Sequence, residues 1–301
     1  QLLSARLSGM SLIVLNLNDP EAPFFQDERV RQALLYGLDR QGLIDHVLGG
    51  QGLVLNSPIM PQSWAYDADI RTYPHDPDRA TALLQEAGWT LPDESRTAFG
   101  ELPPEDKGVR TKQDARLEFT LVTYDIPDRV ALAHAIAEEW DEIGVRTHVK
   151  AVSLSDLTLE YLNPRTFDAA LVQLKLPADP DPYPLWHSTQ AAAGQNYGGF
   201  IDRDADEAIE VARLMIDHGR RAELYSQFQE VFADHVPALL LYQPIYTYGV
   251  DRQVRNVQIA PMPDPSGRFR SISQWEVLEK ELSLRELNDQ VGDKLDKRSD
   301  P

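Results

Sequence analysis

The sequence predicts an α/β domain, and three observations lead to this fold class. Hydrophobic residues make up 42% of the 301 residues and charged residues 26%, a balance typical of a globular protein with a buried core. Residues 117–172 show a strand pattern, a helix pattern and a second strand pattern in succession. Helical and strand patterns then continue to alternate along the chain, as α/β architecture requires.

Strands are expected where short apolar runs alternate with polar residues or form a continuous cluster. In chain order, the expected strands are 11–18, 117–121, 145–151, 167–174, 239–248 and 254–259. The first run, SLIVLNLN, is apolar on both faces and therefore predicts a largely buried strand. Pro20 and Pro23 end it.

Helices are expected where apolar residues recur every three or four positions behind a capping residue. In chain order, the expected helices are 28–40, 42–48, 77–87, 128–143, 156–162, 205–216, 220–235 and 276–295. Asp27 is a suitable N-cap for the first, and Asp76 followed by Pro77 opens the third. Gly49-Gly50 is a suitable end for the second.

The segments between these elements also carry information. The unit 117–172 reads strand–helix–strand, so its two strands should be parallel and joined by a right-handed crossover. Residues 57–74 and 177–199 are rich in proline or polar residues and are expected to be loops. Residues 92–116 are polar and contain Pro103-Pro104, which predicts an exposed insertion.

Charge and cysteine content limit the function classes. The chain has 29 Lys and Arg against 48 Asp and Glu, a formal charge of -19, which repels phosphate backbones and predicts no nucleic-acid partner. Cysteine is absent, which excludes thiol catalysis, disulfides and Cys-ligated zinc within these residues. No apolar run is long enough to span a bilayer. The first residue is Gln1 and no leader follows, so we expect any export signal to lie outside this sequence.

The sequence predicts no catalytic site. None of the seven histidines forms an HExxH or similar metal pair, so no metal and no cofactor is expected. A nucleophile elbow and a phosphate-binding loop are also absent. Asp179 and Asp181 are a carboxylate pair, but neighbouring positions in one proline-rich loop do not flank a bond from opposite sides, so acid–base catalysis is disfavoured.

Four segments resemble one family, the extracellular solute-binding proteins of peptide-type and nickel-type ABC importers (family 5). In order, they read LNLNDPEAPFFQDERVRQALLYGLDRQGLI, then SPIMPQSWAYDADIRTYPHDPDRATALLQEAGW, then ADPDPYPLWHS with GQNYGGF and DRDADEAIEVA, and finally RAELYSQFQEVFADHVPALLLY. They cover about residues 12–257. Arg31 and Asp39 match the family's helix motif, where we interpret them as structural.

The resemblance implies a periplasmic-binding-protein-like (type II, Venus-flytrap) fold of two α/β lobes that enclose the ligand. It divides the chain into the end of the first lobe, the second α/β lobe, a return to the hinge and first lobe, and a charged helical or disordered tail. These regions are residues 1–12, 13–242, 243–275 and 276–301. The N-terminal lobe would be largely absent from this chain.

The resemblance also implies site residues. An aspartate that receives the ligand's α-ammonium in peptide-binding members matches Asp179, and Asp181 lies beside it. A desolvated ammonium needs such a partner, since burying an unpaired charge is costly. Asn196 matches a ligand-facing asparagine. Gln195 and Tyr197 adjoin it, and Trp186 and Trp64 are candidate cleft aromatics.

The expected function is therefore capture of a peptide or peptide-like solute for an ABC permease in the membrane. The resemblance implies a monomer that works outside the cytoplasm and is tethered by a part not contained in this chain. Three alternatives stay open. The same fold could bind a sugar, an opine or a nickel chelate, it could act as a ligand sensor, or it could support a hydrolase.

Overall fold

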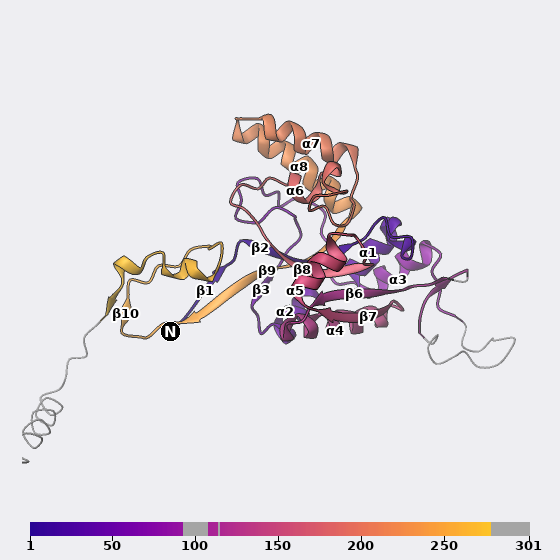
Figure 1. The fold of residues 1–301 in the computed structure, drawn as a ribbon, viewed down its shortest axis with the longest axis horizontal. Helices are drawn as coiled ribbons and strands as arrows, with labels where there is room; N and C mark the ends of the chain where they lie inside the picture. The colour runs from indigo at the N-terminus through magenta and orange to yellow at the C-terminus, as the bar shows by residue number, and fades with distance from the viewer. Residues whose placement is uncertain (93–107, 114, 278–301) are drawn as a thin grey trace, which may run out of the picture.

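The computed structural model describes residues 1–92, 108–113 and 115–277. In this part of the chain a mixed sheet has the order β1-β9-β2-β8-β6-β7, with β3 also paired to β9. Its strands are β1 (Leu2–Arg6), β2 (Gly9–Leu15), β3 (Gly52–Val54), β6 (Glu118–Tyr124), β7 (Arg146–Val152), β8 (Ala169–Lys175) and β9 (Ala238–Gly249). The predicted α/β class is therefore seen directly (Figure 1).

Strand β2 lies at the centre of the sheet, antiparallel to both β8 and β9. All seven of its residues are buried, as the apolar run predicted. It begins at Gly9, four residues ahead of the expected lobe boundary at residue 13, and so includes four residues assigned by sequence to the first lobe. The division into lobes itself stays a prediction.

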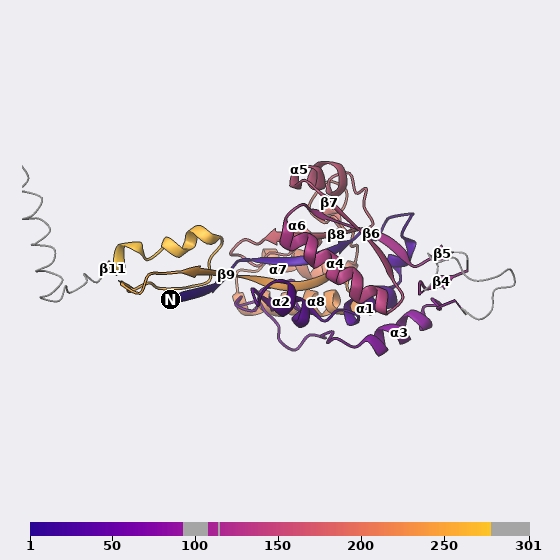
Figure 2. The ribbon, with the colours of Figure 1, turned by 90° about the horizontal axis from the view of Figure 1, so that it is seen from below.

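Helices cover the sheet on two faces (Figures 1 and 2). One core contains Ile13 and Leu15 and lies under α1 (Glu28–Tyr36), α2 (Arg40–Val47), α3 (Pro77–Glu86) and α4 (Pro127–Glu142). The other contains Met10, Leu12 and Val14 and lies under α7 (Arg203–Leu214) and α8 (His218–His235). Because side chains alternate along a strand, β2 supplies both cores at once.

The predicted strand–helix–strand unit is confirmed. Strands β6 and β7 are parallel, with Leu121 opposite Val149, and α4 connects them. Strand β8 is also parallel to β6. Three parallel strands therefore end at the same edge of the sheet, which is where α/β folds place ligands.

The predicted single helix over residues 28–40 is wrong. The structure ends α1 at Tyr36 and starts α2 at Arg40. The reason is Asp39, whose side chain accepts a hydrogen bond from the Gly42 N–H at 2.9 Å and so caps a new helix. The expected end of that helix is confirmed, since Gly49 and Gly50 both have positive φ.

The prediction of an exposed insertion over residues 92–116 is wrong for part of its described residues. Val109 and Arg110 are buried. Arg110 donates hydrogen bonds to the carbonyl oxygens of Ile143, at 2.7 Å, and Trp89, at 3.1 Å. The guanidinium of Arg110 can be buried because its donors satisfy a carbonyl at the end of α4 and another just after α3. Residues 93–107 and 114 lie outside the described residues.

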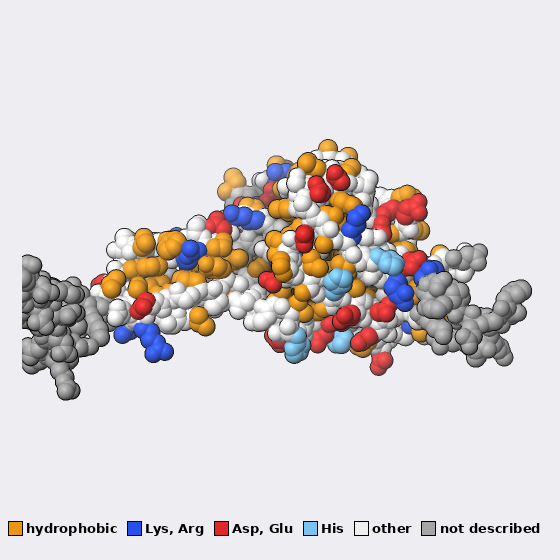
Figure 3. Space-filling view, turned by 60° about the horizontal axis from the view of Figure 1, so that its bottom comes forward, with side chains coloured by type: hydrophobic (Ala, Val, Ile, Leu, Met, Phe, Trp, Pro, Cys, Tyr) orange, Lys and Arg blue, Asp and Glu red, His pale blue; other side chains and the backbone are white. Residues whose placement is uncertain are grey.

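The C-terminal segment lies beside the sheet as an outlying body, yellow in Figure 1. The predicted strand 254–259 is only β10 (Val254–Arg255), which pairs with β11 (Glu276–Val277). Residues 276 and 277 are therefore extended, not helical as expected, and the rest of the predicted tail lies outside the described residues. Apolar side chains gather on this segment in Figure 3, and Ile259, Phe269, Ile272 and Val277 are exposed there.

Arg31 holds the C-terminus of α8, as its structural interpretation required. Its Nε donates to the carbonyl oxygens of His235 and Val236, both at 3.0 Å, and Nη1 donates to that of Phe25 at 2.7 Å. Val236 has φ 47°, an unusual conformation for a β-branched residue. The buried guanidinium satisfies the helix-end carbonyls that this turn leaves without helical partners.

Arg31→Met should lower the free energy of unfolding by about 3 kcal/mol, because buried carbonyl oxygens lose their donors. Urea unfolding followed by circular dichroism measures this loss. Arg29→Met is the matched control on the same helix, since Arg29 is exposed and pairs with Asp27 at the surface. Equal stability losses for the two variants would contradict the structural role of Arg31.

Glu139 makes stability depend on pH. Burial raises the pKa of Glu139 from 4.5 to about 7, although its carboxylate accepts a hydrogen bond from the Asp39 N–H at 2.8 Å. The folded protein therefore holds this proton more tightly than the unfolded chain does. The protonated carboxyl group of Glu139 contributes its full stabilisation below the pKa of the unfolded chain. That contribution is lost as pH rises through the higher pKa of the folded protein.

Glu139→Gln should raise the free energy of unfolding at pH 8 by about 1 kcal/mol, a value discounted because the side chain keeps partial contact with solvent, and should change it little at pH 4. Denaturant titrations at both pH values test this. Glu138→Gln, an exposed neighbour, serves as the control. A benefit of Glu139→Gln that is the same at pH 4 and pH 8 would refute the assignment.

Candidate ligand-binding cleft

A hollow of about 200 Å³ opens between two loops that meet at the carboxyl end of β8. One loop contributes residues 58–60 and 62–64, and the other follows β8 directly. Apolar side chains dominate its lining, including Ile59, Met60, Leu176, Leu185 and Trp186. Ser8 and Pro261 also line it, so the hollow borders the junction with the C-terminal segment. This is the position that the parallel strands predict for a ligand.

Asp179 lies in the hollow, but its carboxylate already has a partner. Arg221, in the first turn of α8, donates to both oxygens at 2.6 and 3.0 Å. The side chain of Arg221 is only 15% exposed, against 56% for Asp179. The carboxylate raises the pKa of Arg221, with further help from the Tyr225 hydroxyl. The expected ammonium-binding residue is thus one half of a bidentate ion pair.

Asp181 has a similar arrangement on the other side of Pro180. Its carboxylate pairs with Arg213, near the end of α7, at 3.2 Å. It also accepts a hydrogen bond from the Tyr183 N–H at 3.1 Å. The Arg213 guanidinium lies 4.1 Å from the centre of the Tyr183 ring. One arginine from α7 and one from α8 therefore hold the two aspartates of the loop that follows β8.

The two predicted cleft aromatics both line the hollow. Trp64 is 41% exposed, with its ring stacked on His218 at 4.5 Å. Trp186 is almost completely buried and packs edge-on against Phe232 at 4.7 Å. Trp64 thus offers surface to a ligand, whereas Trp186 forms part of the floor.

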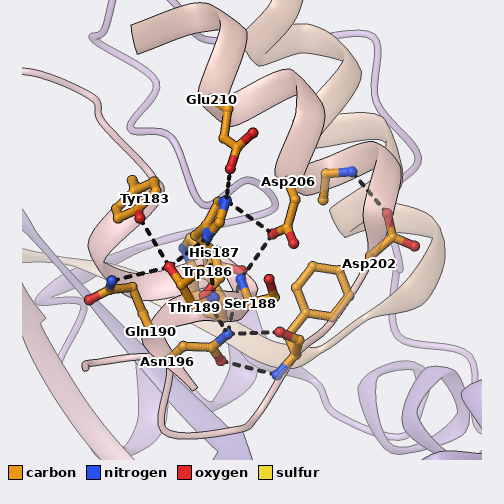
Figure 4. A network of polar contacts seen from close by, with 12 residues as sticks. Tyr183, Trp186, His187, Ser188, Thr189, Gln190, Asn196, Asp202, Asp206 and Glu210 are labelled. Atoms are coloured by element: carbon orange, nitrogen blue, oxygen red, sulfur yellow. Dashed lines mark hydrogen bonds and ion pairs between the residues drawn. The ribbon is translucent and has the colours of Figure 1, made fainter. Parts of the chain in front are cut away.

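Asn196 does not line the hollow, and its expected role as a ligand contact stays a prediction. It is buried, and its Nδ2 donates to the carbonyl oxygens of His187, at 3.1 Å, and Phe200, at 2.8 Å. Its Oδ1 accepts from the Phe200 N–H at 3.0 Å (Figure 4). The side-chain amide of Asn196 thus makes these hydrogen bonds within its own loop. Gln195 and Tyr197 do not line the hollow either, and an arginine, Arg165, lies over the Tyr197 ring.

A polar network behind the hollow was not predicted from the sequence. His187 is 2% exposed, and its ring nitrogens contact the Thr189 hydroxyl at 2.9 Å and the Glu210 carboxylate at 3.1 Å (Figure 4). Asp206 accepts from the Ser188 N–H. Acidic residues four apart on α7 share a helix face, and this spacing was the available clue. The network anchors the residue next to Trp186.

Within the described ranges, no group of three His, Cys, Asp or Glu side chains is arranged to hold a metal ion. The same ranges contain no helix long and apolar enough to cross a membrane.

With the geometry in place, comparison with known proteins gives the family. The model of the bacterial extracellular solute-binding proteins, family 5 (middle region), matches residues 3–196. The chain belongs to this family. It is 30% identical over 272 residues to the oligopeptide-binding protein AppA of Bacillus subtilis, covering 89% of this chain and 47% of that protein. It is 26% identical over 272 residues to the dipeptide-binding protein of Escherichia coli, covering 85% of this chain and 44% of that one.

Solved structures show the same fold. The structure of AppA from Bacillus subtilis in complex with a nonapeptide matches with a TM-score of 0.76 and 26% identity, covering 93% of this chain and 52% of that chain. NikZ from Campylobacter jejuni in complex with Ni(L-His) matches with a TM-score of 0.74 and 22% identity, covering 92% and 53%. The family-5 chain thus spans about half the length of these proteins. The predicted family and the predicted periplasmic-binding-protein-like α/β lobe are confirmed.

Asn196→Ala should lower the free energy of unfolding by about 2–4 kcal/mol, because backbone groups of His187 and Phe200 lose their hydrogen-bond partner. Thermal and urea unfolding measure the change. The adjacent Gln195→Ala is a matched control, since Gln195 is exposed and should change stability by less than about 0.5 kcal/mol. If Asn196→Ala proved as stable as Gln195→Ala, the structural assignment would fail.

Proposed function

We propose that this family-5 chain supplies one lobe of the solute-binding component of an ABC importer, and that the complete protein captures a peptide or peptide-like solute. The hollow at the carboxyl end of β8 carries this proposal. It is concave and mostly apolar with a few polar groups, as small-molecule sites usually are. Both curated relatives reported above are named for peptides.

The position of the hollow supports closure of two lobes around the solute. Strand β9 pairs with β2 over residues 238–242 and then with β1 over residues 245–249, so it continues from the α/β lobe into the C-terminal segment. The exposed apolar residues of that segment are where the first lobe would pack. A solute in the hollow would then contact both bodies and favour the closed arrangement.

Delivery to a membrane permease completes the proposed role. The family is extracellular by its description, so the protein would work outside the cytoplasm, held near the membrane by a part not contained in this chain. It would act as a monomer and release its solute unchanged, without catalysis. Asp179, Asp181, Trp64 and Trp186 are the residues of this lobe proposed to border the solute.

Isothermal titration calorimetry of the complete two-lobe protein with di-, tri- and pentapeptides tests the proposal. We expect dissociation constants in the micromolar range or below, and a smaller radius of gyration by small-angle scattering when peptide is bound. Mass spectrometry should recover the peptides intact. Binding of Ni(L-His) or a sugar without binding of any peptide would favour another solute, and cleavage of the peptides would favour a hydrolase.

A further inference from the structure

We propose that His187 is a positioning residue that makes solute binding depend on pH. Its neutral form holds the loop behind one wall of the hollow, and its protonated form releases part of that loop. The inference rests on the proposed function, because the same loop borders the proposed solute. It adds a conformational response of the lobe to the capture of the solute.

His187 lies directly behind a wall of the hollow. Trp186 lines the hollow at the end of α6 (Tyr183–Trp186), and His187 is the next residue. The short 3-10 helix η4 (Ser188–Gln190) begins immediately after it. The side chain of His187 is 2% exposed, and its ring stacks on that of Tyr183 at 4.3 Å. A change in the hydrogen bonds of His187 therefore acts on both helices of this loop.

The hydrogen bonds of the ring assign one neutral tautomer to His187. Nδ1 accepts from the Thr189 N–H at 3.2 Å and so caps η4, which requires a nitrogen without a proton. Nε2 then carries the proton, and it lies 3.1 Å from the Glu210 carboxylate on α7 (Figure 4). The neutral ring thus joins the loop to α7, and each nitrogen has the partner that it needs.

Protonation changes this arrangement at Nδ1. Both nitrogens of an imidazolium are donors, so the N–H at Nδ1 would face the Thr189 N–H. The Thr189 hydroxyl, 2.9 Å from Nδ1, can accept from the charged ring, but the backbone N–H then loses its acceptor and η4 loses its cap. The carboxylates of Glu210 and Asp206, 3.1 and 3.7 Å from Nε2, are partners for the positive charge. Acid therefore keeps His187 on α7 while it releases η4.

The charged and titratable groups that face His187 come from two elements. Asp206 and Glu210 lie on α7. Tyr183 lies on α6, with the Arg213 guanidinium of α7 4.1 Å from the centre of its ring. Histidine is the residue type among these whose ordinary titration falls between about pH 5 and 8. A response to pH in this range therefore points to the ring of His187.

The chemical shifts of the ring nitrogens test the tautomer without any solute. The complete two-lobe protein is labelled with 15N-histidine, and His187→Asn identifies the signals of His187. At pH 8 we expect a protonated Nε2 and an unprotonated Nδ1, and at pH 5 we expect both to be protonated. A protonated Nδ1 at pH 8, or a ring that stays neutral down to pH 5, would overturn the inference and leave peptide capture standing.

Calorimetry with trialanine and pentaalanine tests the effect on binding, because neither peptide has a side chain that titrates. We expect the affinity of the complete protein to fall by about 5-fold from pH 7.5 to pH 5, which corresponds to the typical contribution of one helix cap. His187→Asn should lose most of this fall, because asparagine can cap η4 and cannot be protonated. His134→Gln, at an exposed position on α4, should keep it. An unchanged affinity in the wild type, or an equal fall in His187→Asn, would refute the role of His187.

Glu210→Gln provides a second variant if His187→Asn proves unstable. Glutamine can still accept from Nε2, but it has no charge to stabilise the protonated ring, so the fall in affinity should occur about 0.3 to 0.7 of a pH unit lower. Glu207→Gln, exposed on the same helix, is the matched control and should leave the midpoint in place. Equal midpoints for the two variants would contradict the inference. If no peptide binds at any pH, the proposed function fails, and the effect on binding fails with it.

Discussion

The structure depends on the burial of β2 on both of its faces. Its residues alternate between two cores, one under α1 to α4 and one under α7 and α8. Because a shift of one residue would exchange the two sets of side chains, the pairing of β2 with β8 and β9 is tightly specified. That register sets where β8 ends, and the end of β8 sets where the cleft loop begins. The position of the hollow thus follows from the central strand.

Buried arginines connect the loops to this framework. Arg40 is 7% exposed, yet no carboxylate pairs with it among the described residues, and burial lowers its pKa to about 10. Its donors go to the carbonyl oxygens of Leu55, Tyr73 and Leu240. Arg31 and Arg110 act in the same way at helix ends. Planar guanidinium groups can satisfy several carbonyls at once, so irregular segments are held without secondary structure of their own.

Much of the fold could be predicted from local patterns, because strand alternation and helix caps depend on residues close in sequence. The parallel unit around α4 followed from such patterns, whereas the family followed from the resemblance of four segments to its members. Asn196 shows the limit. An asparagine in a polar loop looks the same in the sequence whether or not its amide bonds to Phe200, and only the folded chain shows that it does. The pairing of Asp179 with Arg221, 42 residues away, was hidden for the same reason.

Strand β9 has a consequence for motion within the protein. It has 12 residues and changes partners midway, from β2 to β1. Pro244 lies at the change, opposite Gly52, and can give no N–H to the ladder on either side. Its carbonyl still accepts from Leu7 at 2.9 Å. A pair of strands that lacks one N–H donor bends most easily at that point, so we expect thermal bending to concentrate at Pro244. Such bending would tilt the outlying C-terminal segment as one piece, while the packed sheet keeps its shape.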